Sequence, residues 1–223
     1  MPPTRTESEV LFERFCTERK IAHHAISVAD QRTPDYEFYP GGELVIVEVT
    51  QLDANPDDRR VEGGLKAGEM VSYGGTIGQR LRQKLTDKVD QLRVRSKGQM
   101  PTLLVVYNNT AVASYTAPEH VRAAMFGFDT VVLAVPKDPR QSPYAEDRRL
   151  GKGAKATSEH NTSLSAVGIL ERDADDRIGL RVYHNVHARS AIVPAVLRFG
   201  GIHQFVLEER RSGEFQNWIC LDP

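Results

Sequence analysis

The sequence is poor in cysteine and has no excess of charge of either sign. Cys16 and Cys220 stand near opposite ends of the 223-residue chain, without the close spacing that a metal-binding motif requires. We therefore expect two free thiols in a reducing compartment. With 29 basic and 30 acidic residues, the formal net charge is −1, which argues against a protein that coats nucleic acid non-specifically. A local basic groove remains compatible with this balance.

Long apolar runs are also lacking. No run approaches the length of a membrane span, and no signal peptide precedes the first helical segment, so we expect a soluble, cytoplasmic protein without a membrane partner. Shorter apolar runs recur along most of the chain, which is 40% hydrophobic and 26% charged. This composition predicts a single domain over residues 1–223 with a sizeable core, rather than a disordered chain.

Hydrophobic periodicity predicts an alternation of helices and strands. The expected helices lie at 7–20, 77–95 and 118–126. The expected strands are short and lie at 21–28, 36–39, 43–51, 101–107, 129–135, 163–170, 178–183, 203–208 and 215–220. Among them, 101–107 and 129–135 are continuously apolar and are expected to be buried. The polar stretches 55–75 and 137–162 are expected to be loops. This order predicts the α/β class, with a mixed central sheet flanked by helices and additional C-terminal strands.

Two acidic residues stand out in the segment 33–50. Asp35 follows Pro34 at the start of one extended run, and Glu48 interrupts a second run that is otherwise apolar. The turn at 40–42 folds the two runs back on each other, so both carboxylates should lie at the same end of a hairpin. A buried, unpaired carboxylate is costly, and paired oxygen ligands on neighbouring strands suit Mg²⁺. The alternative is that Asp35 starts a turn and Glu48 pairs with a basic residue.

The motif Pro34-Asp35, followed by Glu48-Val49-Thr50 and preceded by Glu9 on the first helix, resembles the PD-(D/E)XK, or restriction endonuclease-like, nuclease superfamily. The archaeal Holliday-junction resolvases of this superfamily also place a catalytic glutamate early in the first helix. The resemblance covers roughly residues 7–107, which implies a catalytic core within 1–110 and leaves 111–223 as the remainder of the sheet with unassigned strands. It implies a metal-dependent endonuclease that hydrolyses phosphodiester bonds in DNA.

The same resemblance implies roles for individual residues. Asp35, Glu48 and the carbonyl of Val49 would bind Mg²⁺, for which Mn²⁺ could substitute. Glu9 would bind the metal directly or through water. Clustered carboxylates raise one another's pKa unless a cation neutralises them, and the metal would lower the pKa of a bound water. Glu13 lies one turn beyond Glu9 on the same helical face and is the alternative helix ligand.

The sequence departs from the superfamily pattern at Thr50, where the pattern has a catalytic lysine. A threonine hydroxyl can hydrogen-bond a water but supplies no positive charge. Three explanations stay open. Thr50 or Gln51 substitutes directly, Lys84 or Lys88 reaches the site from the following helix, or catalysis has been lost. The last would make the protein a catalytically inactive, nuclease-fold nucleic-acid-binding or regulatory protein.

Basic residues on the helix at 77–95 are the candidate DNA contacts. Arg80, Arg82 and Lys84 would hold the phosphate backbone, although an exposed basic face is the plain alternative. Residues Arg148, Arg149, Lys152 and Lys155 would extend that groove or form a charged loop. His184 and His187 point to opposite faces of a strand and do not imply a shared metal. A third hypothesis is an interaction subunit whose later apolar strands form a homodimer.

Overall fold

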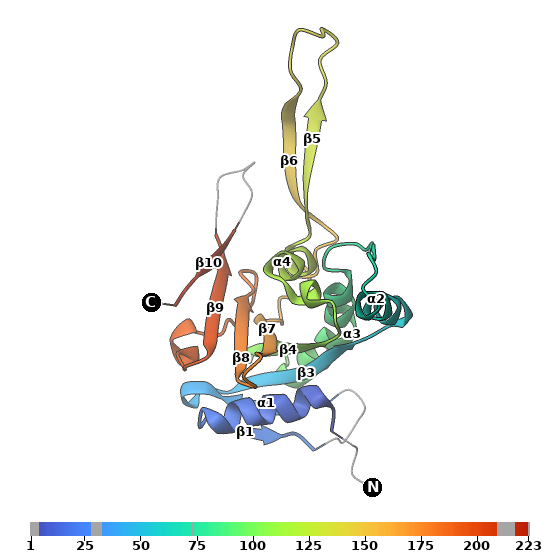
Figure 1. Cartoon of the computed structure of the whole chain (residues 1–223). Coiled ribbons are helices and arrows are strands. Elements are labelled where there is room, and N and C mark those ends of the chain that lie inside the picture. The colour runs from blue at the N-terminus through green and yellow to red at the C-terminus, as the bar shows by residue number, and fades with distance from the viewer. Residues whose placement is uncertain (1–4, 28–32, 73, 209–216, 223) are drawn as a thin grey trace.

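The computed structural model describes residues 5–27, 33–72, 74–208 and 217–222 (Figure 1). Within these residues the α-helices are α1 (Glu7–Glu18), α2 (Pro56–Lys66), α3 (Gln79–Ser96) and α4 (Pro118–Phe126). The strands are β1 (Ala22–Ala25), β2 (Tyr36–Tyr39), β3 (Val45–Asp53), β4 (Thr102–Asn109), β5 (Phe128–Ala134), β6 (Tyr144–Lys152), β7 (Ala166–Arg172), β8 (Ile178–His184), β9 (Ile202–Leu207) and β10 (Trp218–Cys220). The expected mixed α/β class is therefore confirmed, and no described helix has the length and apolarity that crossing a membrane requires.

Eight of the strands form one mixed sheet, in the order β1-β2-β3-β4-β7-β8-β9-β10. The hairpin strands β1, β2 and β3 are antiparallel, whereas β4 lies parallel to both β3 and β7. The parallel connection from β3 to β4 runs through α2 and α3, as a crossover between parallel strands requires. The central position of β3 and β4 explains why both strands are almost entirely buried.

The helices cover the two faces of the sheet unequally (Figure 1). One core contains Phe12 and Phe15 of α1 together with Val47 and Val49 of β3. The other contains apolar residues of α3 and α4 packed on Ile46 and other residues of the opposite face. Because side chains alternate along a strand, Glu48 and Thr50 share the α3 face with Ile46.

Helix α2 occupies the first half of a segment expected to be a loop, so that expectation is wrong for residues 56–66. The local signals for a helix are present. Asn55 and Asp58 form a capping box, in which each side chain accepts a hydrogen bond from the other's backbone N–H. Pro56 stands at the first helical position, where its missing N–H costs nothing. The polar composition and the two glycines of this helix obscured those signals.

Strand β5 is also not the buried strand that was expected. It pairs with β6 in a separate two-stranded sheet that projects from the body (Figure 1). Val131 and Val132 are each 38% exposed, and Leu133 is 61% exposed. The expected loop at 137–162 is correspondingly wrong for residues 144–152, which form β6. The remaining strand expectations agree with the structure to within a few residues, and positions 28 and 215–216 lie outside the described residues.

Candidate functional site

Asp35 is held at the end of the hairpin by three main-chain contacts. Its N–H donates to the carbonyl of Val47 at 3.1 Å, and its carbonyl accepts from the N–H of Ile26 at 2.8 Å. Its carboxylate oxygen Oδ2 accepts from the N–H of Val49 at 2.7 Å. The strand ladder therefore continues one residue beyond β2, and by alternation Asp35 shares the α3 face with Glu37 and Glu48.

Glu48 is the buried acid of the site, with 1% of its surface exposed. Its oxygen Oε1 accepts a hydrogen bond from Nζ of Lys88 on α3 at 2.7 Å, and the lysine side chain is 29% exposed. Its second oxygen, Oε2, is buried and has no hydrogen-bond partner among the described residues. One half of this carboxylate is therefore satisfied by a lysine, and the other half has no donor.

The electrostatics show that Asp35, Glu48, Glu9 and Lys88 lie close enough to affect one another. Burial raises the pKa of Asp35 to about 6, and the charge of Glu9 raises it further. The hydrogen bond from Val49 acts in the opposite direction. Burial and then the charge of Asp35 raise the pKa of Glu48 to about 7, although Lys88 opposes the shift. Asp35 and Glu48 thus have the charge of Glu9 nearby and the ammonium of Lys88 to offset it, and a second cation would relieve the remaining repulsion.

The two glutamates of α1 have different surroundings. Glu9 closes the N-terminal capping box of the helix, where its Oε2 accepts from the N–H and the hydroxyl of Thr6 at 2.5 and 2.7 Å. Its charge nevertheless raises the pKa of both Asp35 and Glu48. Glu13 instead accepts hydrogen bonds from the hydroxyl of Tyr36 at 2.9 Å and from Arg5 at 2.6 Å. Glu9 is therefore the α1 acid whose charge acts on both Asp35 and Glu48.

Of the four side chains Thr50, Gln51, Lys84 and Lys88, that of Lys88 contacts Glu48. Thr50 is buried on the same face of β3. Gln51 lies on the α1 face, where its Oε1 accepts from the N–H of Ser8 at 3.3 Å and its Nε2 donates to Asp53 at 2.6 Å. The Gln51 side chain thus ties the start of α1 to β3.

The carbonyl of Val49 lies on the edge of β3 that faces Asp35. Within a strand, the N–H and C=O of one residue point to the same side, and the Val49 N–H donates to Asp35. Among the described residues, no group of three or more His, Cys, Asp or Glu side chains is arranged to hold a metal ion. A cation at Asp35 and Glu48 would therefore draw its other ligands from this carbonyl and from water.

The three candidate DNA contacts on α3 differ in what they contact. Arg80 donates to Asp58 at 2.8 Å and to the carbonyl of Asp53 at 2.6 Å. Arg82 lies over the ring of Phe128 at 4.7 Å and donates to the carbonyl of Ala123 at 3.1 Å. Lys84 lies between Arg80 and Lys88 on one helical stripe, and within the described chain it has no hydrogen-bond or ion-pair partner.

A second buried acid was missed in the sequence. Asp58, at 1% exposure, accepts from Arg80, from the Tyr115 hydroxyl at 2.5 Å and from the N–H of Asn55 at 2.9 Å. This network joins α2, α3 and the turn before α4. Beside it lies a polar pocket of about 330 Å³, lined by residues that include Thr76, Gln79, Arg80 and His120. The capping box at Asn55 was the available signal for this acid.

His184 and His187 contact different residues and do not share a site. Nε2 of His184 lies 3.1 Å from Oε1 of Gln204. The ring of His187 packs edge-on against that of Phe126, with 6.1 Å between the ring centroids. Comparison with known proteins adds no further assignment. No family model, no curated protein and no solved structure matches this chain.

Proposed function

We propose that this protein is a metal-dependent endonuclease of the PD-(D/E)XK type, with a restriction endonuclease-like core, that hydrolyses phosphodiester bonds in DNA. The order α1, β1, β2, β3, α3 and β4 supports the proposal, because it carries the motif residues at the positions that the resemblance implies. The helix α2 is an addition between β3 and α3 in this interpretation.

The observation that carries the proposal is the unsatisfied half of the Glu48 carboxylate. A buried oxygen without a donor is unfavourable, and here it lies near a second carboxylate whose charge raises its pKa. Oxygen ligands of this kind suit Mg²⁺, and Mn²⁺ would substitute for it. The residues present therefore fit a divalent cation bound by Asp35, Glu48 and the Val49 carbonyl.

Each residue of the site has a definite task under this proposal. Asp35 and Glu48 bind the cation, and Glu9 adds negative charge from α1. Lys88 holds one oxygen of Glu48 in place and takes the position of the lysine that Thr50 does not supply. Lys84 is available to contact the phosphate backbone of DNA. The bound metal would lower the pKa of a water and stabilise charge on the phosphate.

The direct test is cleavage of plasmid and single-stranded DNA with Mg²⁺ or Mn²⁺. We expect the wild type to cleave, and Asp35→Asn and Glu48→Gln to lose at least about a hundredfold in rate. Asp90→Asn is the matched control, because Asp90 is an exposed acid on the solvent side of α3. Equal cleavage by the wild type and Asp35→Asn would overturn the proposal.

One observation favours a second candidate, a nuclease-fold protein that binds nucleic acid or regulates without turnover. Thr50 occupies the lysine position, and the Lys88 ammonium already neutralises part of the charge of Glu48. Calorimetric titration with Mn²⁺ separates the two candidates. A heat of binding that disappears in Glu48→Gln supports the enzyme. The same heat with and without Glu48, together with uncut DNA, supports the second candidate.

A further inference from the structure

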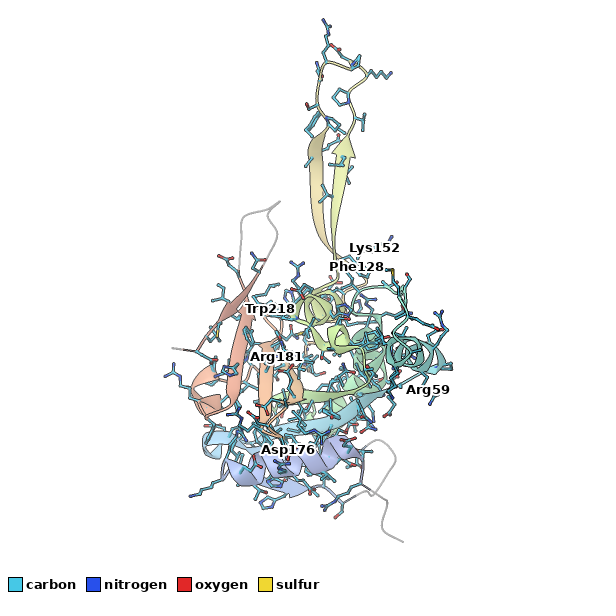
Figure 2. All side chains as sticks on the ribbon, viewed as in Figure 1. Arg59, Phe128, Lys152, Asp176, Arg181 and Trp218 are labelled. Carbon is cyan, nitrogen blue, oxygen red and sulfur yellow. The ribbon has the colours of Figure 1, made fainter. Side chains whose placement is uncertain are left out.

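The segment 128–152, here called the ribbon, consists of β5, the tip 135–143 and β6. Its base is fixed to the body. The guanidinium of Arg82 lies over the Phe128 ring, and the N–H groups of Lys155 and Ala156 donate to the carbonyl of Met125 at 2.9 and 2.7 Å. Figure 2 shows Phe128 and Lys152 where the ribbon leaves α4, with side chains standing in the open above them. The ribbon therefore projects by itself, outside the central sheet.

Apolar side chains line the projecting part. Leu133 is 61% exposed, Val135 75% and Tyr144 59%, and the two valines at 131 and 132 are each 38% exposed. A single two-stranded hairpin is at best marginally stable in water. An exposed apolar strand also offers unpaired N–H and C=O groups to any other strand. Pairing with a further strand would cover these apolar side chains and satisfy these backbone groups.

The two edges of the ribbon differ in their protection against pairing. In β6, Glu146 and Gly151 are extra residues that oppose nothing on β5, so this strand is bulged twice. The β6 sequence also contains the charged run 146–149 (EDRR). Bulges and charges are the devices that keep edge strands single. Strand β5 has no extra residue, and its sequence has no charge from Thr130 to Val135, so β5 is the open edge.

The sequence of β5 is complementary to itself. Residues 129, 131, 133, 135 and 137 are Asp, Val, Leu, Val and Lys, one face of an extended strand at a period of two. An antiparallel pairing centred on Leu133 sets position 129 of one copy opposite position 137 of the other, and 131 opposite 135. An aspartate then lies opposite a lysine at both ends of the pairing, and aliphatic residues lie opposite each other between them. Residues 135–137, just beyond β5, would extend the strand.

We propose that β5 pairs antiparallel with β5 of a second copy of this chain, about a two-fold axis at Leu133, to form a four-stranded sheet from two ribbons. A two-fold axis perpendicular to a sheet keeps each residue on its face, so the pairing satisfies both symmetry and register. The tip of each ribbon then reaches the base of the other. This inference goes beyond the proposed nuclease function and does not depend on it.

The composition of the ribbon favours a second copy over nucleic acid. Residues 128–152 contain five basic and four acidic residues, which is not the one-sided positive charge that a DNA-binding arm needs. The projecting part also exposes aliphatic and aromatic side chains, which are common in protein interfaces: Val131, Val132, Leu133, Val135 and Tyr144.

The first experiment is sedimentation velocity of the full chain over a range of concentrations. We expect a reversible dimer, which Leu133→Lys dissociates by placing two like charges at the two-fold axis. Leu65→Lys is the matched control, because Leu65 on α2 is also an exposed leucine, at 57%. A wild type that stays monomeric would overturn the proposal, as would equal dissociation by both substitutions. Dimerisation that occurs only in the presence of DNA would likewise overturn it.

A charge exchange tests the register. Asp129→Lys sets lysine opposite Lys137 of the second copy, and Lys137→Asp sets two acids opposite each other. Each variant alone should raise the dissociation constant about tenfold or more. An equimolar mixture of the two should recover the wild-type affinity, because every opposed charge is again complementary, and so should the double variant. Weakened single variants that do not recover on mixing would contradict this register.

Discussion

Two buried acids in this protein, Glu48 and Asp58, face the same helix but have different surroundings. Each is 1% exposed, and each pairs with a basic residue of α3, Lys88 in one case and Arg80 in the other. Burial tends to raise the pKa of Asp58, but hydrogen bonds from Tyr115, Asn55 and Arg80 outweigh it, so that pKa lies below its ordinary value. Burial and the nearby charge of Asp35 raise the pKa of Glu48 to about 7.

The difference lies in how completely each carboxylate is satisfied. Both oxygens of Asp58 accept hydrogen bonds, whereas Oε2 of Glu48 accepts none among the described residues. A buried acid with a full set of donors stabilises the fold it joins. A buried acid that lacks donors and lies near another acid is a candidate ligand site, because an added cation would satisfy its free oxygen.

The largest expected effect that separates the two acids is on stability. Asp58→Asn leaves Arg80 without its charged partner and weakens the joint between α2 and α3. We expect the free energy of unfolding to fall by about 3 kcal/mol in urea titrations. Glu48→Gln removes a charge that its surroundings disfavour, and the metal-free protein should keep or gain stability near pH 8. A comparable loss in Glu48→Gln would remove the distinction between the acids.

The second expected effect is stabilisation by the metal. Mg²⁺ that binds the folded protein at Asp35 and Glu48 should add about 2.7 kcal/mol at 100 times its dissociation constant. Thermal unfolding of the wild type should therefore shift upward with Mg²⁺, and that of Glu48→Gln should not. Asp58→Asn, although less stable at the start, should show the full upward shift. An equal shift in all three proteins would place the metal elsewhere.

The third expected effect concerns pH in the absence of metal. The pKa values of Asp35 and Glu48 rise from 3.8 and 4.5 to about 6 and about 7 on folding. The folded protein thus keeps protons that the unfolded chain has lost, and the free energy of unfolding should fall as the pH rises from about 4 to about 7. At about 1.4 kcal/mol per pKa unit, the two shifts together correspond to a fall of roughly 6 kcal/mol.

Asp58 should contribute with the opposite sign. Its lowered pKa means that its stabilisation is present above the unfolded value of 3.8 and is lost as the pH falls through the folded value. In urea titrations, the free energy of unfolding of Asp58→Asn should still fall between about pH 4 and 7. That of Glu48→Gln should fall less over the same range. A slope of unchanged size in Glu48→Gln would contradict the assignment.

The smallest expected effect is on DNA binding by α3. Lys84 contacts no acid in the described chain, so Lys84→Ala should weaken binding of all DNA sequences alike and reduce the salt slope of the binding constant by about 1. Arg82 packs against Phe128 and α4, and Arg82→Ala should leave the slope unchanged. Fluorescence anisotropy at several salt concentrations measures both. Equal salt slopes for the two variants would show that Lys84 does not contact the DNA.

Local signals in the sequence were sufficient for much of the site. The Pro34-Asp35 start, the turn at 40–42 and the lone acid in an apolar strand predicted that Asp35 and Glu48 would share one end of a hairpin. Lys88 was among the alternatives for the missing lysine, but only the packing of α3 on β3 distinguishes it from Lys84. Glu9 and Glu13 are equivalent on a helix, and the Tyr36 hydroxyl, distant in sequence, separates them.

Other features depend on contacts that no local pattern encodes. The apolar run of β5 has the composition of a buried strand, yet its neighbour is the charged β6 and not the central sheet. The cationic residue Arg80 was expected to face DNA, and it meets a buried acid of a helix that polar composition had concealed. In both cases the partner lies at least ten residues away along the chain.

The most direct test of the central claim is anomalous diffraction from crystals soaked in Mn²⁺. The account predicts a peak about 2.2 Å from one oxygen of Asp35 and one oxygen of Glu48, with the Val49 carbonyl beside it. The account would be contradicted by crystals that bind Mn²⁺ at other sites but show no peak here, with Lys88 as the only partner of Glu48.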